Sequence, residues 1–125
     1  MVVPKFRAVF KNKIISEVGS IDFINKTVTI PIYDKETDEY LADYELSLDL
    51  VTLMQSTGLF DINGKEIFEG DIVRMHSGEL LPVKLHHGMF EPVCYYISNV
   101  FERVGNVFEN PELLEHPDFR EVLND

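Results

Sequence analysis

The chain has 125 residues, of which 45% are hydrophobic and 26% charged, and its formal net charge is −11. This composition is typical of one globular domain or two small lobes, and no apolar run approaches the roughly 18 residues of a membrane span. We therefore expect no membrane partner and, because so negative a surface repels phosphate groups, no direct nucleic-acid partner.

The first ten residues, MVVPKFRAVF, predict a strand and no secretory signal. Lys5 and Arg7 interrupt what would be the apolar core of a signal peptide, so we expect a cytoplasmic protein. In KFRAVF the apolar residues Phe6, Ala8 and Phe10 alternate with polar ones, which is the period of a strand.

A hairpin is predicted over residues 20–33, where two alternating runs, SIDFI and TVTIPIY, flank Asn25 and Lys26. Asn tolerates the left-handed backbone conformation that many tight turns need. Pro31 lacks an amide hydrogen, so it places the second strand at a sheet edge or ends its pairing.

Residues 34–49, DKETDEYLADYELSLD, hold seven acidic residues and one lysine. We expect a solvated loop there, with a short helix over residues 39–44, rather than a cation site. The next run, LVTLMQ from Leu50, is apolar enough for an interior strand.

The stretch TGLFDINGKEIFEGDIV, residues 57–73, contains an Asn-Gly pair that predicts a hairpin. A two-residue loop would set Asp61 opposite Glu66, two like charges. A three-residue loop with Gly64 in the left-handed conformation instead pairs Asp61 with Lys65, Phe60 with Glu66, and Leu59 with Ile67. Opposed like charges weaken a cross-strand pair, so we expect the three-residue loop.

A second turn follows, in which Asp71 is expected to accept a hydrogen bond from a nearby turn amide. Backbone reversals thus account for the glycines and charges of this stretch. We expect its residues to form a structural motif, comprising Thr57, Gly58, Asp61, Asn63, Gly64, Lys65, Gly70 and Asp71.

No catalytic, cofactor-binding or metal-binding residues are expected. A calcium loop with Gly64 at its sixth position would need oxygen ligands where Leu59 and Gly70 stand. His86 and His87, as neighbours in a strand, should point to opposite faces and so not share a metal.

The lone Cys94 lies in VCYYI, a run that predicts a buried strand. The chain has no phosphate loop and no recognisable nucleophile elbow, so we expect no enzyme.

The remaining chain predicts further strands and a helical end. The runs DIVRMH, LLPVKLH, VCYYI and NVFERV are strand candidates at the spacing of a small barrel or sandwich. Asn110 is expected to cap a short helix that begins at Pro111, and a second short helix is expected over residues 117–123. The apolar side of this tail would dock on its own subunit or on a neighbour, which leaves a homo-oligomer open.

Three segments resemble the YopX family of small phage and prophage proteins. The central one, MQSTGLFDINGKEIFEGDIV, is similar to the family pattern Met-Gln, Thr-Gly-Leu, Asp-x-Asn-Gly-Lys-Glu-Ile and Glu-Gly-Asp-Ile-Val. KFRAVF resembles the family opening, with Val9 where Trp is usual. GNVFENPELLE, residues 105–115, resembles the family's closing segment, with Val107 and Phe108 as conservative departures.

The resemblance implies a mainly β fold, with a β-rich N-terminal part over residues 1–56 and an SH3-type small barrel over residues 57–109. The helical tail expected from the residues themselves, over residues 110–125, completes a single compact unit, and its part beyond Glu115 lies outside the shared pattern. The resemblance also implies a phage or prophage gene that acts in the cytoplasm of a bacterial host. It implies no activity, because the family has no established catalytic residues.

Three functions remain open from the sequence. The first is a non-enzymatic accessory protein that binds a host or phage protein. The second is an acidic nucleic-acid mimic that occupies the basic cleft of a host protein through residues 34–49 and the acidic tail. The third, an enzyme, would require a deep pocket of titratable groups with shifted pKa values. The plainest alternative to any recognition role is that the negative charge maintains solubility.

Overall fold

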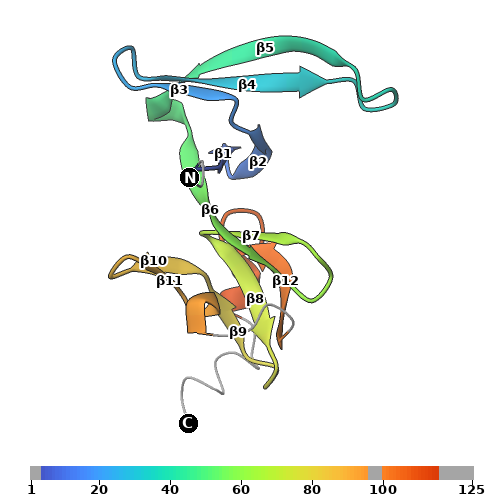
Figure 1. Cartoon of the computed structure of the whole chain (residues 1–125), viewed down its shortest axis with the longest axis vertical. Helices are drawn as coiled ribbons and strands as arrows, with labels where there is room; N and C mark the ends of the chain where they lie inside the picture. The colour runs from blue at the N-terminus through green and yellow to red at the C-terminus, as the bar shows by residue number, and fades with distance from the viewer. Residues whose placement is uncertain (1–3, 96–99, 116–125) are drawn as a thin grey trace. The chain divides into compact units, whose positions relative to one another are not determined.

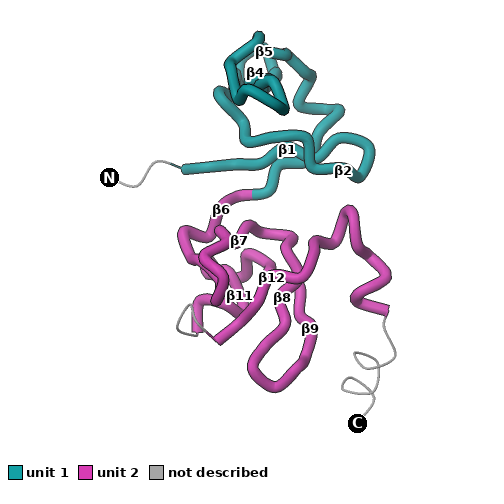
Figure 2. The backbone as a smooth tube through the Cα atoms, turned by 90° about the vertical axis from the view of Figure 1, so that its right-hand side faces the viewer, with its two compact units in different colours: residues 1–54 teal, residues 55–125 magenta. Residues whose placement is uncertain are grey.

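The computed structural model describes residues 4–95 and 100–115 and is mainly β, which confirms the predicted class (Figure 1). The chain divides into two compact units, Met1–Met54 and Gln55–Asp125 (Figure 2). In the described residues no helix is long and apolar enough to cross a membrane. The predicted boundaries at residues 56 and 109 stay predictions.

Unit 1 contains two groups of antiparallel strands. Strand β1 (Phe6–Phe10) pairs with β2 (Lys13–Glu17), with an irregularity between Ala8 and Val9. Strands β3 (Ser20–Asp22), β4 (Thr27–Tyr33) and β5 (Tyr40–Ser47) form a sheet with β4 in the centre. A 3-10 helix, η1 (Leu48–Leu50), follows β5.

The predicted hairpin over residues 20–33 is confirmed as β3 and β4, which pair Asp22 with Thr27. The left-handed residue of its turn is Lys26, at φ 57°, rather than Asn25. The Asn25 side chain instead donates a hydrogen bond of 2.7 Å to Asp22. Pro31 lies beyond the end of β3, so its missing amide hydrogen removes no bond from that pairing.

The loop predicted over residues 34–49 is confirmed only for residues 34–39, and the short helix predicted over residues 39–44 is wrong. Residues Tyr40–Ser47 are the eight-residue strand β5, paired with β4 along its length. The turn begins at Asp34, whose Oδ1 accepts hydrogen bonds from the backbone N–H groups of Glu36 and Thr37 at 2.8 and 3.0 Å. This turn closes a hairpin and carries four of the seven acidic residues, whereas only Asp43 and Glu45 project from strand β5.

The core of unit 1 lies under the first half of β4. Ala8, Val28 and Ile30 are buried there, and six partly buried side chains pack around them: Val18, Ile21, Leu46, Leu48, Val51 and Leu53. Burying apolar surface is the main favourable contribution to folding, at roughly 25 cal/mol per Å2. This core therefore holds the base of the β4–β5 hairpin in place.

Unit 2 is built on the remaining strands. Strand β6 (Thr52–Phe60) enters it from unit 1 and pairs with β7 (Glu66–Phe68). Strand β8 (Asp71–Met75) lies between β9 (Leu80–Pro82) and β12 (Phe101–Asn106), while β10 (Lys84–His86) pairs with β11 (Met89–Glu91). One cluster of buried apolar side chains in this unit contains Ile67, Val73, Met75, Val83, Val93 and Phe101.

Three of the four strand runs predicted after residue 70 are strands, and VCYYI is not. In its described part, Val93–Tyr95 form the 3-10 helix η2, closed by a hydrogen bond from the Tyr95 N–H to the Pro92 carbonyl. Val93 is buried, but Cys94 is exposed, so the predicted buried thiol is also wrong. A turn of about three residues directs only one of three side chains inward.

The described part of the C-terminal tail is one 3-10 helix, η4 (Pro111–Glu115). It starts at the predicted residue, but the Asn110 side chain accepts a hydrogen bond from the Asn106 N–H behind it. The helix predicted over residues 117–123 lies outside the described residues. The SH3-type barrel also stays a prediction.

Candidate functional site

The motif of residues 57–73 forms the predicted three-residue hairpin. Phe60 pairs with Glu66, the Asp61 N–H donates to the Lys65 carbonyl at 2.8 Å, and Gly64 has φ 78°. The expected pairing of Leu59 with Ile67 is replaced by a bulge. Ser56 pairs with Phe68, so three residues of β6 face one residue of β7.

Asp61 connects this hairpin to strand β12. Its side chain is 4% exposed. Its Oδ1 accepts hydrogen bonds from the N–H groups of Asn63 and Lys65 at 2.9 and 2.8 Å, and its Oδ2 accepts one from the Arg103 N–H at 2.8 Å. Burial alone would raise the pKa of Asp61, but these three amides outweigh it and lower the pKa. The sequence predicted a charge pair with Lys65, whereas backbone amides hold the carboxylate.

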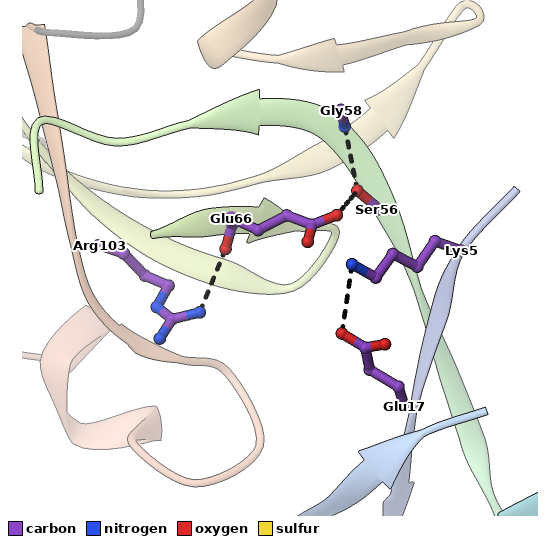
Figure 3. A network of polar contacts seen from close by, with 6 residues as sticks. All are labelled: Lys5, Glu17, Ser56, Gly58, Glu66 and Arg103. Atoms are coloured by element: carbon purple, nitrogen blue, oxygen red, sulfur yellow. Dashed lines mark hydrogen bonds and ion pairs between the residues drawn. The ribbon is translucent and has the colours of Figure 1, made fainter. Parts of the chain in front are cut away.

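The bulge in β6 is stabilised by hydroxyl groups. The Thr57 hydroxyl donates to the Ile67 carbonyl at 2.7 Å, and the Ser56 hydroxyl donates to Glu66. Gly58, at φ 77°, donates its N–H to the Ser56 hydroxyl oxygen (Figure 3). Thr57 and Gly58 therefore shape the backbone of the bulge.

The second turn is fixed in the same way. The Asp71 side chain is buried and its Oδ2 accepts a hydrogen bond from the Phe68 N–H at 2.8 Å, as predicted. Gly70, at φ 94°, donates to the Val83 carbonyl and accepts from the Val107 N–H, each at 2.8 Å. These contacts join segments far apart in the sequence. Six of the eight motif residues thus shape the backbone of unit 2: Thr57, Gly58, Asp61, Gly64, Gly70 and Asp71.

The two other motif residues lie on the outside of the hairpin. Asn63 and Lys65 are both exposed. The Asn63 side-chain amide donates to Glu102 at 3.3 Å, and Lys65 contributes its backbone groups to the turn. The described residues contain no group of three or more His, Cys, Asp or Glu side chains placed to hold a metal ion.

A shallow pocket of about 280 Å3 lies in unit 2. It is lined by Leu81, Pro82, Lys84, Leu85, His86, Glu91 and Pro92. The predicted opposite orientation of His86 and His87 is wrong. Their rings stack with centroids 4.0 Å apart, because His87 has a positive φ of 52° in the turn after β10. His86 also lies 3.5 Å from the Glu91 carboxylate.

The largest group of exposed apolar side chains is on the β3–β5 sheet of unit 1. Seven of the fourteen large hydrophobic side chains that are exposed in the described residues lie within residues 23–44. Scattered exposed apolar residues are ordinary, whereas a concentrated group is a candidate interaction surface. Five of the seven belong to the outer part of the β4–β5 hairpin, residues 31–45, which we call the arm: Ile32, Tyr33, Tyr40, Leu41 and Tyr44.

The arm combines these apolar groups with negative charge. Its five apolar side chains are 40% to 59% exposed. Between residues 34 and 45 the sequence places six acidic residues and one lysine. The Tyr33 and Tyr40 rings meet edge to face with centroids 6.0 Å apart, and a hydrogen bond to Asp43 raises the pKa of Tyr40.

The arm is ordered by its own turn. Asp34 donates its N–H to the Glu39 carbonyl and accepts the Asp38 N–H, at 2.8 and 2.9 Å. Hydrogen bonds from the Thr37 and Glu36 amides lower the pKa of Asp34. An ordered turn reduces the entropy lost on binding.

A second exposed apolar feature is the turn between β3 and β4. Phe23 and Ile24 are 77% and 92% exposed. Asp22 fixes this turn by accepting the N–H groups of Ile24 and Asn25, each at 3.0 Å. No signal in the sequence separated these two residues from core positions, because both belong to SIDFI, whose apolar residues Ile21 and Phe23 alternate as in a strand.

Comparisons with known proteins identify the family. The family model described as YopX protein matches residues 5–115. Among solved structures, the chain is similar to protein EF1440 from Enterococcus faecalis, with 26% sequence identity and a TM-score of 0.63 over 91% of this chain and 99% of that chain. No curated protein matches the chain. Because the family match covers nearly the whole chain, this protein belongs to the YopX family.

Proposed function

We propose that this protein is a non-enzymatic, protein-binding accessory protein of a phage or prophage, acting in the bacterial cytoplasm. Membership of the YopX family supports a small accessory role. The observation that carries the binding role is the arm, where five large apolar side chains are exposed beside six acidic residues. Aromatic side chains in such a setting are typical of binding hot spots.

The chemistry of the arm selects the kind of partner. Its aromatic and aliphatic groups favour an apolar patch, and its carboxylates favour Lys and Arg around that patch. A basic host or phage protein with an apolar centre fits both properties. The tyrosines supply contact area at low entropic cost, since each orders only two side-chain torsions.

The predicted acidic mimic of nucleic acid remains the second candidate. Six acidic residues between positions 34 and 45 favour it. A mimic would act mainly through charge, so its affinity should fall steeply as salt rises. An apolar contact surrounded by charge should keep most of its affinity, because burial of apolar surface does not depend on screening.

Replacing Tyr33, Tyr40 and Tyr44 together by Ser should abolish capture of a protein partner from a bacterial lysate. The loss should be about a hundredfold or more in affinity, since three hot-spot tyrosines at about 1 kcal/mol each sum to about 3 kcal/mol. The stability should change little, because all three side chains are exposed. The measurement is quantitative capture on the tagged full chain, with the melting temperature as a check of folding.

A matched variant controls for the general loss of exposed apolar surface. Leu85, Met89 and Tyr95 are similarly exposed but lie in unit 2, so their replacement by Ser should leave capture unchanged. Capture that survives the tyrosine changes would contradict the proposal. Capture that disappears between about 0.05 and 0.5 M salt would favour the acidic mimic.

A further inference from the structure

The outer edge of strand β5 carries backbone groups that no described residue pairs with. β5 is an edge strand, with β4 on its other side. The Leu48 N–H donates to the Lys26 carbonyl at 2.8 Å, which identifies these two as a hydrogen-bonded pair. In an antiparallel ladder such pairs alternate with pairs whose amides point away. Extending the observed register, Asp43 and Glu45 have N–H and C=O groups that point outward.

Two observations on β4 support this alternation. Thr29, opposite Glu45, offers its carbonyl to Gly19 on the far side, at 2.8 Å. Pro31, opposite Asp43, has no N–H and could not occupy a hydrogen-bonded position facing β5 without loss of a bond. Both residues therefore direct their backbone groups away from β5, as the alternation requires.

The side chains along this edge form two rows. Glu45 and Asp43 lie on the face of Thr29 and Pro31, because directly opposed residues share a face. Ala42, Tyr44 and Leu46 lie on the other face, opposite Ile32, Ile30 and Val28. One row of the edge is acidic and the other is mostly apolar.

We propose that β5 binds an extended, antiparallel segment of a partner protein in which basic and apolar residues alternate. This inference rests on the proposed protein-binding role and specifies its mode, strand addition. A Lys or Arg opposite Asp43 or Glu45 shares the acidic face, and its own N–H points toward β5. The next residue lies on the face of Tyr44, where an apolar side chain is favoured.

A second copy of this chain does not fit the same edge. Antiparallel pairing of two β5 strands would bring the Asp43 and Glu45 carboxylates of each copy together. Like charges directly opposite each other weaken pairing. Charged residues on an edge strand are a common protection against self-association. The same charges that oppose a second copy favour a basic segment.

The test uses the full chain and a pool of labelled ten-residue peptides with Lys at alternate positions and varied apolar residues between them. Binding is measured by fluorescence anisotropy. N-methylation of the Lys residues removes the amides that would face β5, and it should weaken binding about tenfold or more. N-methylation of the apolar residues removes outward-facing amides only, and it should leave binding within about threefold.

Two substitutions in the protein itself, rather than in the peptide, test the same edge. Glu45→Pro removes an outward N–H that β4 does not use, so binding should weaken about tenfold or more while the fold is kept. Glu45→Gln keeps the N–H and removes the charge, so binding should weaken only a few-fold. The molar mass measured by light scattering should show that the natural chain does not dimerise through this edge.

The outcomes separate the inference from the proposed function. The two N-methylated pools could bind equally well, and their binding could be lost in the variant with Tyr33, Tyr40 and Tyr44 changed to Ser. That result would overturn strand addition but would still support a protein-binding arm. Absence of binding by every pool would also overturn strand addition, and lysate capture then decides the proposed function by itself. Dimer formation abolished by Glu45→Pro would overturn the partner chemistry in favour of a second copy.

Discussion

Replacement of Asp61 by Ala is expected to lower the free energy of unfolding by about 2–4 kcal/mol. The change removes the acceptor of three backbone N–H groups, those of Asn63, Lys65 and Arg103. Because the carboxylate is buried, water replaces it poorly, and unsatisfied buried donors are costly. Urea unfolding followed by circular dichroism measures the loss.

Lys65→Ala is the control variant, because it removes the charge expected to pair with Asp61 and keeps the Asp61 carboxylate. Its ammonium group is exposed, and its backbone bonds to Asp61 persist in the variant, so the change should stay within about 0.5 kcal/mol. A loss for Asp61→Ala no larger than for Lys65→Ala would contradict the role assigned to the carboxylate.

The same carboxylate predicts how stability depends on pH. The pKa of Asp61 is lower in the folded chain than in the unfolded chain, so its contribution is fully present above the unfolded value, near about 3.9. The contribution is lost as pH falls through the lower, folded pKa. The difference in stability between the natural chain and Asp61→Ala should therefore shrink below about pH 4.

Gly105→Val is expected to destabilise the chain by about 1–3 kcal/mol through overpacking. A Cβ atom at this position would lie 2.6 Å from the Asn110 Oδ1 atom and 2.9 Å from a methyl carbon of Leu113. Asn110 cannot move freely, because its Oδ1 accepts the Asn106 N–H. The strain would loosen the link between β12 and the helix η4.

Thermal unfolding tests this effect against a change on the same strand. Glu102→Val adds a β-branched residue at a partly exposed position of β12, so it should alter stability by no more than about 0.5 kcal/mol. Equal melting temperatures for the Gly105→Val and Glu102→Val variants would show that the close packing around Gly105 is not as described.

Local signals in the sequence were enough to predict the central hairpin and the strands around it. Asn63, Gly64 and the charges of Asp61 and Glu66 together select one loop length, and that register is observed. The bulge before it was missed, because it depends on the hydroxyls of Ser56 and Thr57 reaching β7, which no local pattern specifies. Asp61's bond to Arg103 joins residues 42 apart in sequence and was likewise beyond local reasoning.

The acidic part of the candidate binding surface was named from the sequence within residues 34–49, but its strand and its exposed apolar side chains were missed. Tyr40, Ala42, Tyr44 and Leu46 alternate as in a strand, but the acidic residues among them favoured a loop. Exposure of the apolar positions could not be foreseen, because alternation normally marks a buried face. The strand predicted for VCYYI was wrong for the opposite reason. Its apolar composition is equally compatible with a strand or a turn, and the 3-10 turn of Val93 is decided by tertiary packing.

The family motif and the arm thus have different roles in this account. The motif's Asp61, Asp71 and glycines hold the backbone of unit 2, while the arm presents apolar and acidic groups outward. If the proposed function holds, the residues that identify the family are not the ones expected to contact a partner.

Hydrogen–deuterium exchange of the full chain, with and without a captured partner, tests this division most directly. The partner should slow exchange at the outward amides of Asp43 and Glu45 by about tenfold or more and leave residues 57–73 unchanged. Slower exchange within residues 57–73, with the arm unchanged, would contradict the account and place the binding site on the family motif.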